Sequence, residues 1–121
     1  MGRINVVEYK GKRILVQDFS GVRAGEEFDR SITEAKAYIA SQPANSILSL
    51  FDATKAIYNT TVLTALKDFT KHNAPYMKAS AVVGIEGILN IALLAVSTFS
   101  GRTFKSFSDR QSAMDWLVEQ A

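Results

Sequence analysis

Three acidic residues in the sequence could form a site for a hard cation: Asp18, Asp52 and Glu86. Each is expected at or just after the carboxyl end of a strand, and open α/β sheets bind ligands at that edge. Three carboxylates there could hold Mg²⁺, which prefers oxygen ligands. Acids at strand ends also commonly cap the following loop, and the neighbouring residues add no further ligand. We therefore favour loop capping and expect neither a metal nor a cofactor.

Nucleophilic catalysis has few candidate residues in this chain. The sequence contains no Cys and one His, His72. His72 is expected at the C-terminus of a helix, where it can serve the last carbonyls. The Gly-x-Ser-x-Gly pattern of a nucleophile elbow is absent from the sequence. We expect a protein that is not an enzyme, and a hydrolase using a Ser or Thr with His72 is the weaker alternative.

Gly84-Ile85-Glu86-Gly87 follows a run of small residues, in the position where phosphate-binding loops join a strand to a helix. The pattern matches neither G-x-G-x-x-G nor G-x-x-x-x-G-K-[ST]. Glu86 would also place negative charge where a phosphate binds. We expect Gly84 to permit a tight turn and Glu86 to complement the N-terminus of the next helix.

The apolar stretch from Ala79 to Phe99 contains one charged residue, Glu86. Glycines and Asn90 interrupt it, and residues 85–99 would extend about 22 Å as a helix, short of the roughly 30 Å hydrocarbon core of a bilayer. We expect a strand and a helix buried in the core, and no integral membrane segment. The opening residues MGRINVVEYKGKR lack an apolar run suited to a signal peptide, so a cytoplasmic location is expected.

The charge balance gives little support for a nucleic-acid partner. The 14 basic and 12 acidic side chains leave a net charge of +2. The basic residues occur in small groups, without the interleaved aromatic residues of RNA-binding modules. We expect these groups to be solvated and no nucleic acid to bind.

The hydrophobic pattern predicts one α/β domain over residues 1–121, with the order β-β-α-β-α-β-α-β-α. Alternating strands and helices imply a mostly parallel five-stranded sheet, with an antiparallel strand at one edge and about four flanking helices. Strands are expected at 4–9, 13–19, 46–52, 78–83 and 103–107. A first helix is expected around the apolar stripe Phe28, Ile32, Ala35 and Ile39. A second is expected around Val62, Leu66 and Phe69, with Thr60 or Asn59 as its N-cap, and a third at 86–100. A last helix should follow a capping box formed by Ser108 and Gln111, with Ala113, Trp116 and Leu117 facing inward.

Four stretches of the chain carry a family resemblance: GKRILVQDFSG, SLFDAT, KHNAPYMKASAVVG and GRTFKSFSDRQSAMDWL. Together they resemble the SpoIIAA-like branch of the STAS superfamily, which is sometimes described jointly with Sec14-like lipid-binding domains. The resemblance extends from Gly11 to Leu117. It implies a mostly parallel sheet flanked by helices.

Anti-sigma-factor antagonists of this kind carry Asp-Ser-Ser-Gly at the start of the second helix, where a partner kinase phosphorylates one serine. The matching residues here are Asn59-Thr60-Thr61-Val62, which lack the acidic residue and the glycine. The resemblance makes Thr60 a candidate phosphoacceptor. The simpler interpretation is that Thr60 caps the helix.

We therefore expect a non-enzymatic regulatory domain that binds an unidentified protein partner and self-associates as a homodimer. The candidate contact residues lie around the loop from Ala53 to Thr61: Asp52, Tyr58, Asn59, Thr60, Thr61 and Gly84. The alternative is a carrier or sensor of a small lipophilic ligand held between sheet and helices. Its candidate pocket residues, which are also typical core residues, are Phe51, Tyr58, Phe69, Tyr76, Met77 and Phe99.

Overall fold

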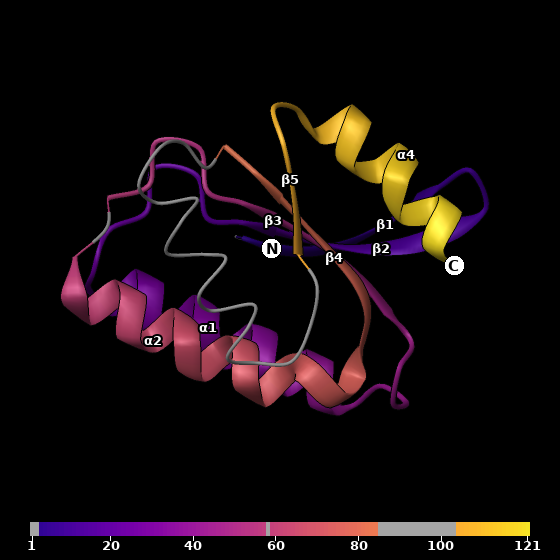
Figure 1. Ribbon diagram of the computed structural model, residues 1–121. Coiled ribbons are helices and arrows are strands. Elements are labelled where there is room, and N and C mark those ends of the chain that lie inside the picture. The colour runs from indigo at the N-terminus through magenta and orange to yellow at the C-terminus, as the bar shows by residue number, and fades with distance from the viewer. Residues whose placement is uncertain (1–2, 58, 85–103) are drawn as a thin grey trace.

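The computed structural model describes residues 3–57, 59–84 and 104–121 (Figure 1). These residues form five strands and three α-helices, with a short 3₁₀ turn at Ala74–Tyr76. The strands are β1 (Ile4–Tyr9), β2 (Lys12–Asp18), β3 (Ile47–Asp52), β4 (Met77–Val83) and β5 (Phe104–Phe107). The helices are α1 (Glu26–Ala40), α2 (Thr60–Asn73) and α4 (Arg110–Gln120). The helix expected at 86–100 lies outside the described residues.

The five strands form one sheet in the order β1-β2-β3-β4-β5. β1 pairs antiparallel with β2, and each later neighbour pairs in parallel. The turn between β1 and β2 has positive φ at both Lys10 (51°) and Gly11 (81°), as a two-residue hairpin turn requires. The predicted mostly parallel five-stranded sheet with an antiparallel edge strand is therefore confirmed.

Helices cover both faces of the sheet (Figure 1). α1 and α2 lie on one face, and their buried side chains Phe28, Ile32 and Phe69 pack in a cluster with Leu15 and Ile47 of the sheet. α4 lies on the opposite face. There Ala113 and Leu117, both fully buried, pack with side chains of β2, β3 and β4 that include Ile14, Leu50 and Ala81. Small side chains in β4 let this short helix approach the sheet closely.

The two helices that flank the later strands begin at side-chain caps. The Asn59 side chain accepts a hydrogen bond from the backbone N–H of Val62, 2.9 Å away, at the start of α2. At α4 the cap is Asp109, which accepts from the backbone N–H of Ser112 at 2.8 Å. The predicted Ser108–Gln111 capping box is therefore wrong by one residue, because the Asp109 carboxylate takes the capping position.

Most of the apolar stretch 79–99 lies outside the described residues, but the first residues of this stretch belong to β4. Within the described ranges, no helix has both the length and the apolar composition needed to cross a bilayer.

Candidate functional site

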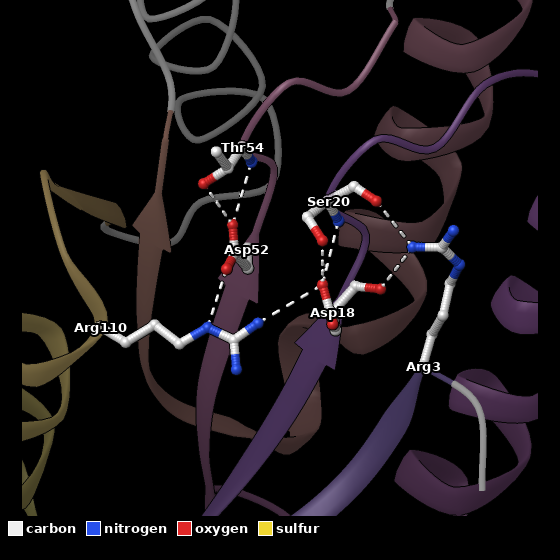
Figure 2. A network of polar contacts seen from close by, with 6 residues as sticks. All are labelled: Arg3, Asp18, Ser20, Asp52, Thr54 and Arg110. Atoms are coloured by element: carbon white, nitrogen blue, oxygen red, sulfur yellow. Dashed lines mark hydrogen bonds and ion pairs between the residues drawn. The ribbon is translucent and has the colours of Figure 1, made fainter.

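Two of the predicted carboxylates lie next to each other at the carboxyl edge of the sheet. Asp18 ends β2 and Asp52 ends β3, and they are register partners in the parallel ladder. The sheet therefore brings together residues that are far apart in the sequence (Figure 2). Glu86, the third predicted member of the group, lies outside the described residues.

Each of these aspartates closes the loop that follows it. Asp18 Oδ1 accepts hydrogen bonds from the Ser20 backbone N–H at 3.1 Å and the Ser20 hydroxyl at 2.5 Å. Asp52 Oδ1 accepts the equivalent pair from Thr54, at 2.9 Å from the N–H and 2.6 Å from the hydroxyl. Side chains of Asp commonly hydrogen-bond to backbone two residues on and so stabilise a turn. The prediction that these acids cap loops is confirmed for Asp18 and Asp52.

Arg110, the first residue of α4, connects the two aspartates (Figure 2). Its Nε donates to Asp52 Oδ2 at 2.8 Å, and its Nη2 lies 3.4 Å from Asp18 Oδ1. The Asp52 side chain is only 9% exposed, whereas that of Asp18 is 40% exposed. The guanidinium therefore supplies the positive charge that the buried carboxylate needs.

Both carboxyl groups have pKa values below the ordinary range for aspartate. Burial raises the pKa of Asp52, but hydrogen bonds from Thr54 and Arg110 lower it by more. Burial also raises the pKa of Asp18, and this is outweighed by hydrogen bonds from Ser20 and the charge of Arg110. Both groups are ionised at neutral pH and act as hydrogen-bond acceptors.

Asp18 and Asp52 have a structural role in the described part of the chain. Among the residues that the structure describes, no group of three or more His, Cys, Asp or Glu side chains could hold a metal ion. Asp18 and Asp52 are instead satisfied by their own loops and by Arg110. They tie two loops and the start of α4 to the end of the sheet.

A second arginine holds the loop after β2 from its other side. Arg3 Nη1 donates to the backbone carbonyls of Asp18 and Ser20, each at 2.9 Å (Figure 2). Its Nε lies 3.2 Å from the Glu27 carboxylate in the first turn of α1. The sequence pattern predicted no role for Arg3 or Arg110. The one signal for Arg110 was its place in GRTFKSFSDRQSAMDWL, a stretch that carries the family resemblance.

Gly84 brings the end of β4 against the loop after β3. Its φ is 85°, and a Cβ at this position would lie 2.6 Å from Thr54 Cα and 2.7 Å from Thr54 N. Any other residue would therefore combine an unfavourable backbone conformation with a collision against main chain. This conformation agrees with the turn that the sequence predicts for Gly84.

The loops after β2 and β3 run side by side and are joined through their backbones. The Gly21 N–H donates to the Thr54 carbonyl at 2.8 Å, and the Ile57 N–H donates to the Val22 carbonyl at 2.7 Å. Val22 is buried, whereas the Ile57 side chain is one of the most exposed large apolar groups of the described residues, at 52%. The paired loops thus hold an exposed apolar side chain on a fixed backbone.

The start of α2 follows directly after these loops. Asn59, Thr60 and Thr61 are all exposed. Of the two predicted caps, Asn59 is confirmed, and the interpretation of Thr60 as the helix cap is wrong. Tyr58, also predicted for this surface, lies outside the described residues.

His72 does not join the strand-end acids. It lies in the last turn of α2, where its Nδ1 is 2.8 Å from Asn73 Oδ1. α2 is 14 residues long, which places its two ends about 20 Å apart. The predicted position of His72 at a helix C-terminus is confirmed, and the helix separates it from Asp52.

The aromatic positions considered for a lipophilic pocket are mainly core positions. Phe69 and Met77 are buried, and Phe51 and Tyr76 pack against the same cluster. Phe51 also stacks on Phe19, with ring centroids 4.8 Å apart. Tyr58 and Phe99 lie outside the described residues.

No family model and no curated protein matches the sequence. Among solved structures, the chain is similar to an uncharacterized protein of the DUF3478 family with a SpoIIAA-like fold, from Shewanella loihica PV-4. The TM-score is 0.75 at 18% sequence identity, and the match covers 94% of this chain and 91% of that one. The chain has a SpoIIAA-like fold. The resemblance noted in the sequence is thereby confirmed for the fold, and at this identity the likeness shows the fold alone.

Proposed function

We propose that the protein is a non-enzymatic, cytoplasmic regulatory domain that binds another protein through the loops at the carboxyl edge of its sheet. The contact surface comprises Ile57 and the first residues of α2, Asn59, Thr60 and Thr61. Asp52 and Gly84 lie beneath this surface and fix the shape of the loop.

The exposed side chain of Ile57 is the observation that carries this proposal. Protein interfaces concentrate their binding energy in a few apolar anchors that lose contact with water on association. An anchor on a preformed backbone costs less ordering entropy when the partner binds. The hydrogen bond from Ile57 to Val22 supplies that preformed backbone.

The test is affinity capture from the source cells with the full chain, comparing the parent protein with Ile57→Ser and Ala37→Ser. Ala37 is also an exposed apolar residue, but it lies in α1 rather than in the loops. We expect a captured protein whose recovery falls about tenfold with Ile57→Ser and is unchanged with Ala37→Ser. Equal recovery with all three proteins would exclude Ile57 as the anchor, and no enrichment over bare beads would count against a stable partner.

Within this proposal, Thr60 is the phosphoacceptor that controls binding. Because Asn59 supplies the cap, the Thr60 hydroxyl is not needed for that role. The first turn of α2 contains no acidic residue, so a phosphate there would interact favourably with the helix N-terminus. Thr60→Asp should change the affinity for the captured partner, and Thr60→Ala should remove kinase-dependent control. Thr64→Ala is the control, because Thr64 is an exposed threonine of α2 outside the proposed contact surface. Unaltered binding with both Thr60 variants would refute the switch.

Self-association is proposed through β1, which is an edge strand of the described sheet. An edge strand offers backbone groups that can pair with a second copy. Sedimentation equilibrium should then give a mass above the 13.3 kDa of one chain, increasing with protein concentration. A constant mass of one chain up to millimolar concentration would exclude the homodimer.

A further inference from the structure

A small open cleft lies at the edge of the sheet opposite to the paired loops. Its volume is about 220 Å³. Val6 of β1, Arg13 and Leu15 of β2 and Ile47 at the start of β3 line one side. Tyr38 near the end of α1 and Gln42 in the loop after it line the other side. The cleft therefore uses other residues than the proposed protein-binding surface and the candidate lipophilic pocket.

The cleft has a mixed lining that includes apolar side chains of the sheet. Leu15 and Ile47 belong to the buried cluster beneath α1 and α2. Val6 is the register partner of Leu15 on β1, yet 43% of it is exposed. The fold thus leaves apolar surface uncovered beside the cleft, and a short hydrocarbon chain lying there would remove that surface from water.

A cationic side chain borders these apolar side chains. Arg13 lies two residues before Leu15 in β2, so both side chains are on the same face of the strand. Glu8 is its cross-strand partner, but Arg13 forms no ion pair with any residue in the described parts of the chain. Its guanidinium has donors suited to a planar carboxylate. Tyr38 and Gln42, which carry a hydroxyl and an amide group, line the same cleft.

We propose that this cleft binds a small organic anion, namely a carboxylate that carries a short hydrocarbon chain. Arg13 holds the carboxylate, and the chain lies on Val6, which supplies most of the exposed apolar surface beside the nearly buried Leu15 and Ile47. The volume is below the roughly 300–1,000 Å³ of pockets for drug-sized ligands, which limits the occupant to a short chain.

The probe for the test is sodium hexanoate, titrated into the ¹⁵N-labelled full chain and followed by two-dimensional NMR. Saturable shifts are expected for the backbone amides of Leu15, Tyr38, Gln42 and Ile47. Acetate keeps the charge without the chain, and 1-hexanol keeps the chain without the charge. Each should bind at least about fivefold more weakly than hexanoate, because each loses one of the two interactions.

The matched variants are Arg13→Gln and Lys12→Gln. Both remove one positive charge from adjacent, exposed positions of β2, but strand alternation directs Lys12 to the opposite face of the sheet. Arg13→Gln should weaken hexanoate binding about fivefold or more, and Lys12→Gln should change it by less than about twofold. Val6→Ser should also weaken binding, which tests the apolar part without touching the arginine.

Three results would overturn the site. They are the absence of saturable shifts in the parent protein, equal weakening by the two charge variants, and hexanoate binding that Arg13→Gln leaves unchanged. Equal weakening would mean that hexanoate responds only to net charge. None of these results bears on Ile57, so this site and the proposed protein-binding surface stand or fall separately.

Discussion

Replacing Arg110 with methionine should destabilise the fold by about 2–3 kcal/mol at pH 7. A hydrogen bond to a charged group contributes about 1.5–3 kcal/mol. The full amount applies to Asp52, because its side chain is 9% exposed and water cannot replace the guanidinium. The longer contact to the half-exposed Asp18 adds less than about 1 kcal/mol. The two hydrogen bonds from Thr54 remain and limit the loss.

The effect should depend on pH in a defined direction. The pKa of Asp52 in the folded protein lies below its ordinary value. Its carboxylate therefore stabilises the fold fully above the unfolded pKa of about 3.9, and this contribution is lost as the pH falls through the lower folded value. Arg110→Met removes one cause of the lowered pKa. The stability difference between parent and variant should be largest at neutral pH and should shrink below about pH 4.

Urea unfolding of the parent protein, Arg110→Met, Asp52→Asn and the double variant measures this coupling. For 121 residues, 2–3 kcal/mol corresponds to a decrease of about 8–12 °C in melting temperature. The double variant should lose less stability than the sum of the two single losses, by about 1 kcal/mol or more. The reason is that it contains no buried carboxylate without a guanidinium partner. Arg23→Met is the control, since Arg23 is exposed and no ion pair joins it to another described residue. Additive losses, or an Arg110 effect no larger than that of Arg23, would refute the bridge.

Three further substitutions, two of them compared with a second variant, test the remaining supports of the fold around the site by urea unfolding. Gly84→Ala should cost about 1–3 kcal/mol more than Gly21→Ala, because both glycines have positive φ but an added Cβ meets backbone only at Gly84. Equal losses would contradict the close approach. Asn59→Ala should cost about 1 kcal/mol and Thr60→Ala less than about 0.5 kcal/mol, since Asn59 is the cap. The reverse order would contradict that assignment. Leu117→Ala should cost about 2–5 kcal/mol, because this fully buried side chain packs α4 on the sheet, and a loss below 1 kcal/mol would contradict that packing.

The elements of the sheet could be predicted because their signals are local. Apolar runs bounded by turn residues predicted β2, β3 and β4 to within one or two residues. The apolar stripe from Phe28 to Ile39 predicted α1, and all four of its residues are buried. Strand ends also placed Asp18 and Asp52 at one edge, since parallel neighbours end together. These inferences needed nothing beyond the period of the pattern and the direction of the strands.

The positively charged residues of the site, Arg3 and Arg110, could not be predicted in this way. Arg110 is 58 residues from Asp52 in the sequence, and Arg3 reaches the carbonyl of Asp18 over 15 residues. Charged side chains on exposed elements have no period that reveals their partners. The start of α4 was misplaced for a related reason. Both Ser108 and Asp109 are good capping residues, and the path of the chain from β5 decides between them.

The same tripeptide arrangement occurs twice at the carboxyl edge, as Asp18-Phe19-Ser20 and Asp52-Ala53-Thr54. In each, the aspartate binds both the backbone N–H and the hydroxyl of the residue two positions on. Two adjacent strands thus end in the same turn, and Arg110 joins the two turns to the start of α4. Because the loop with Ile57 continues from the second turn, we expect the position of this exposed side chain to depend on the Arg110 contacts at the carboxyl edge. Arg110 is therefore a positioning residue for the proposed surface, in which Ile57 is the proposed contact residue.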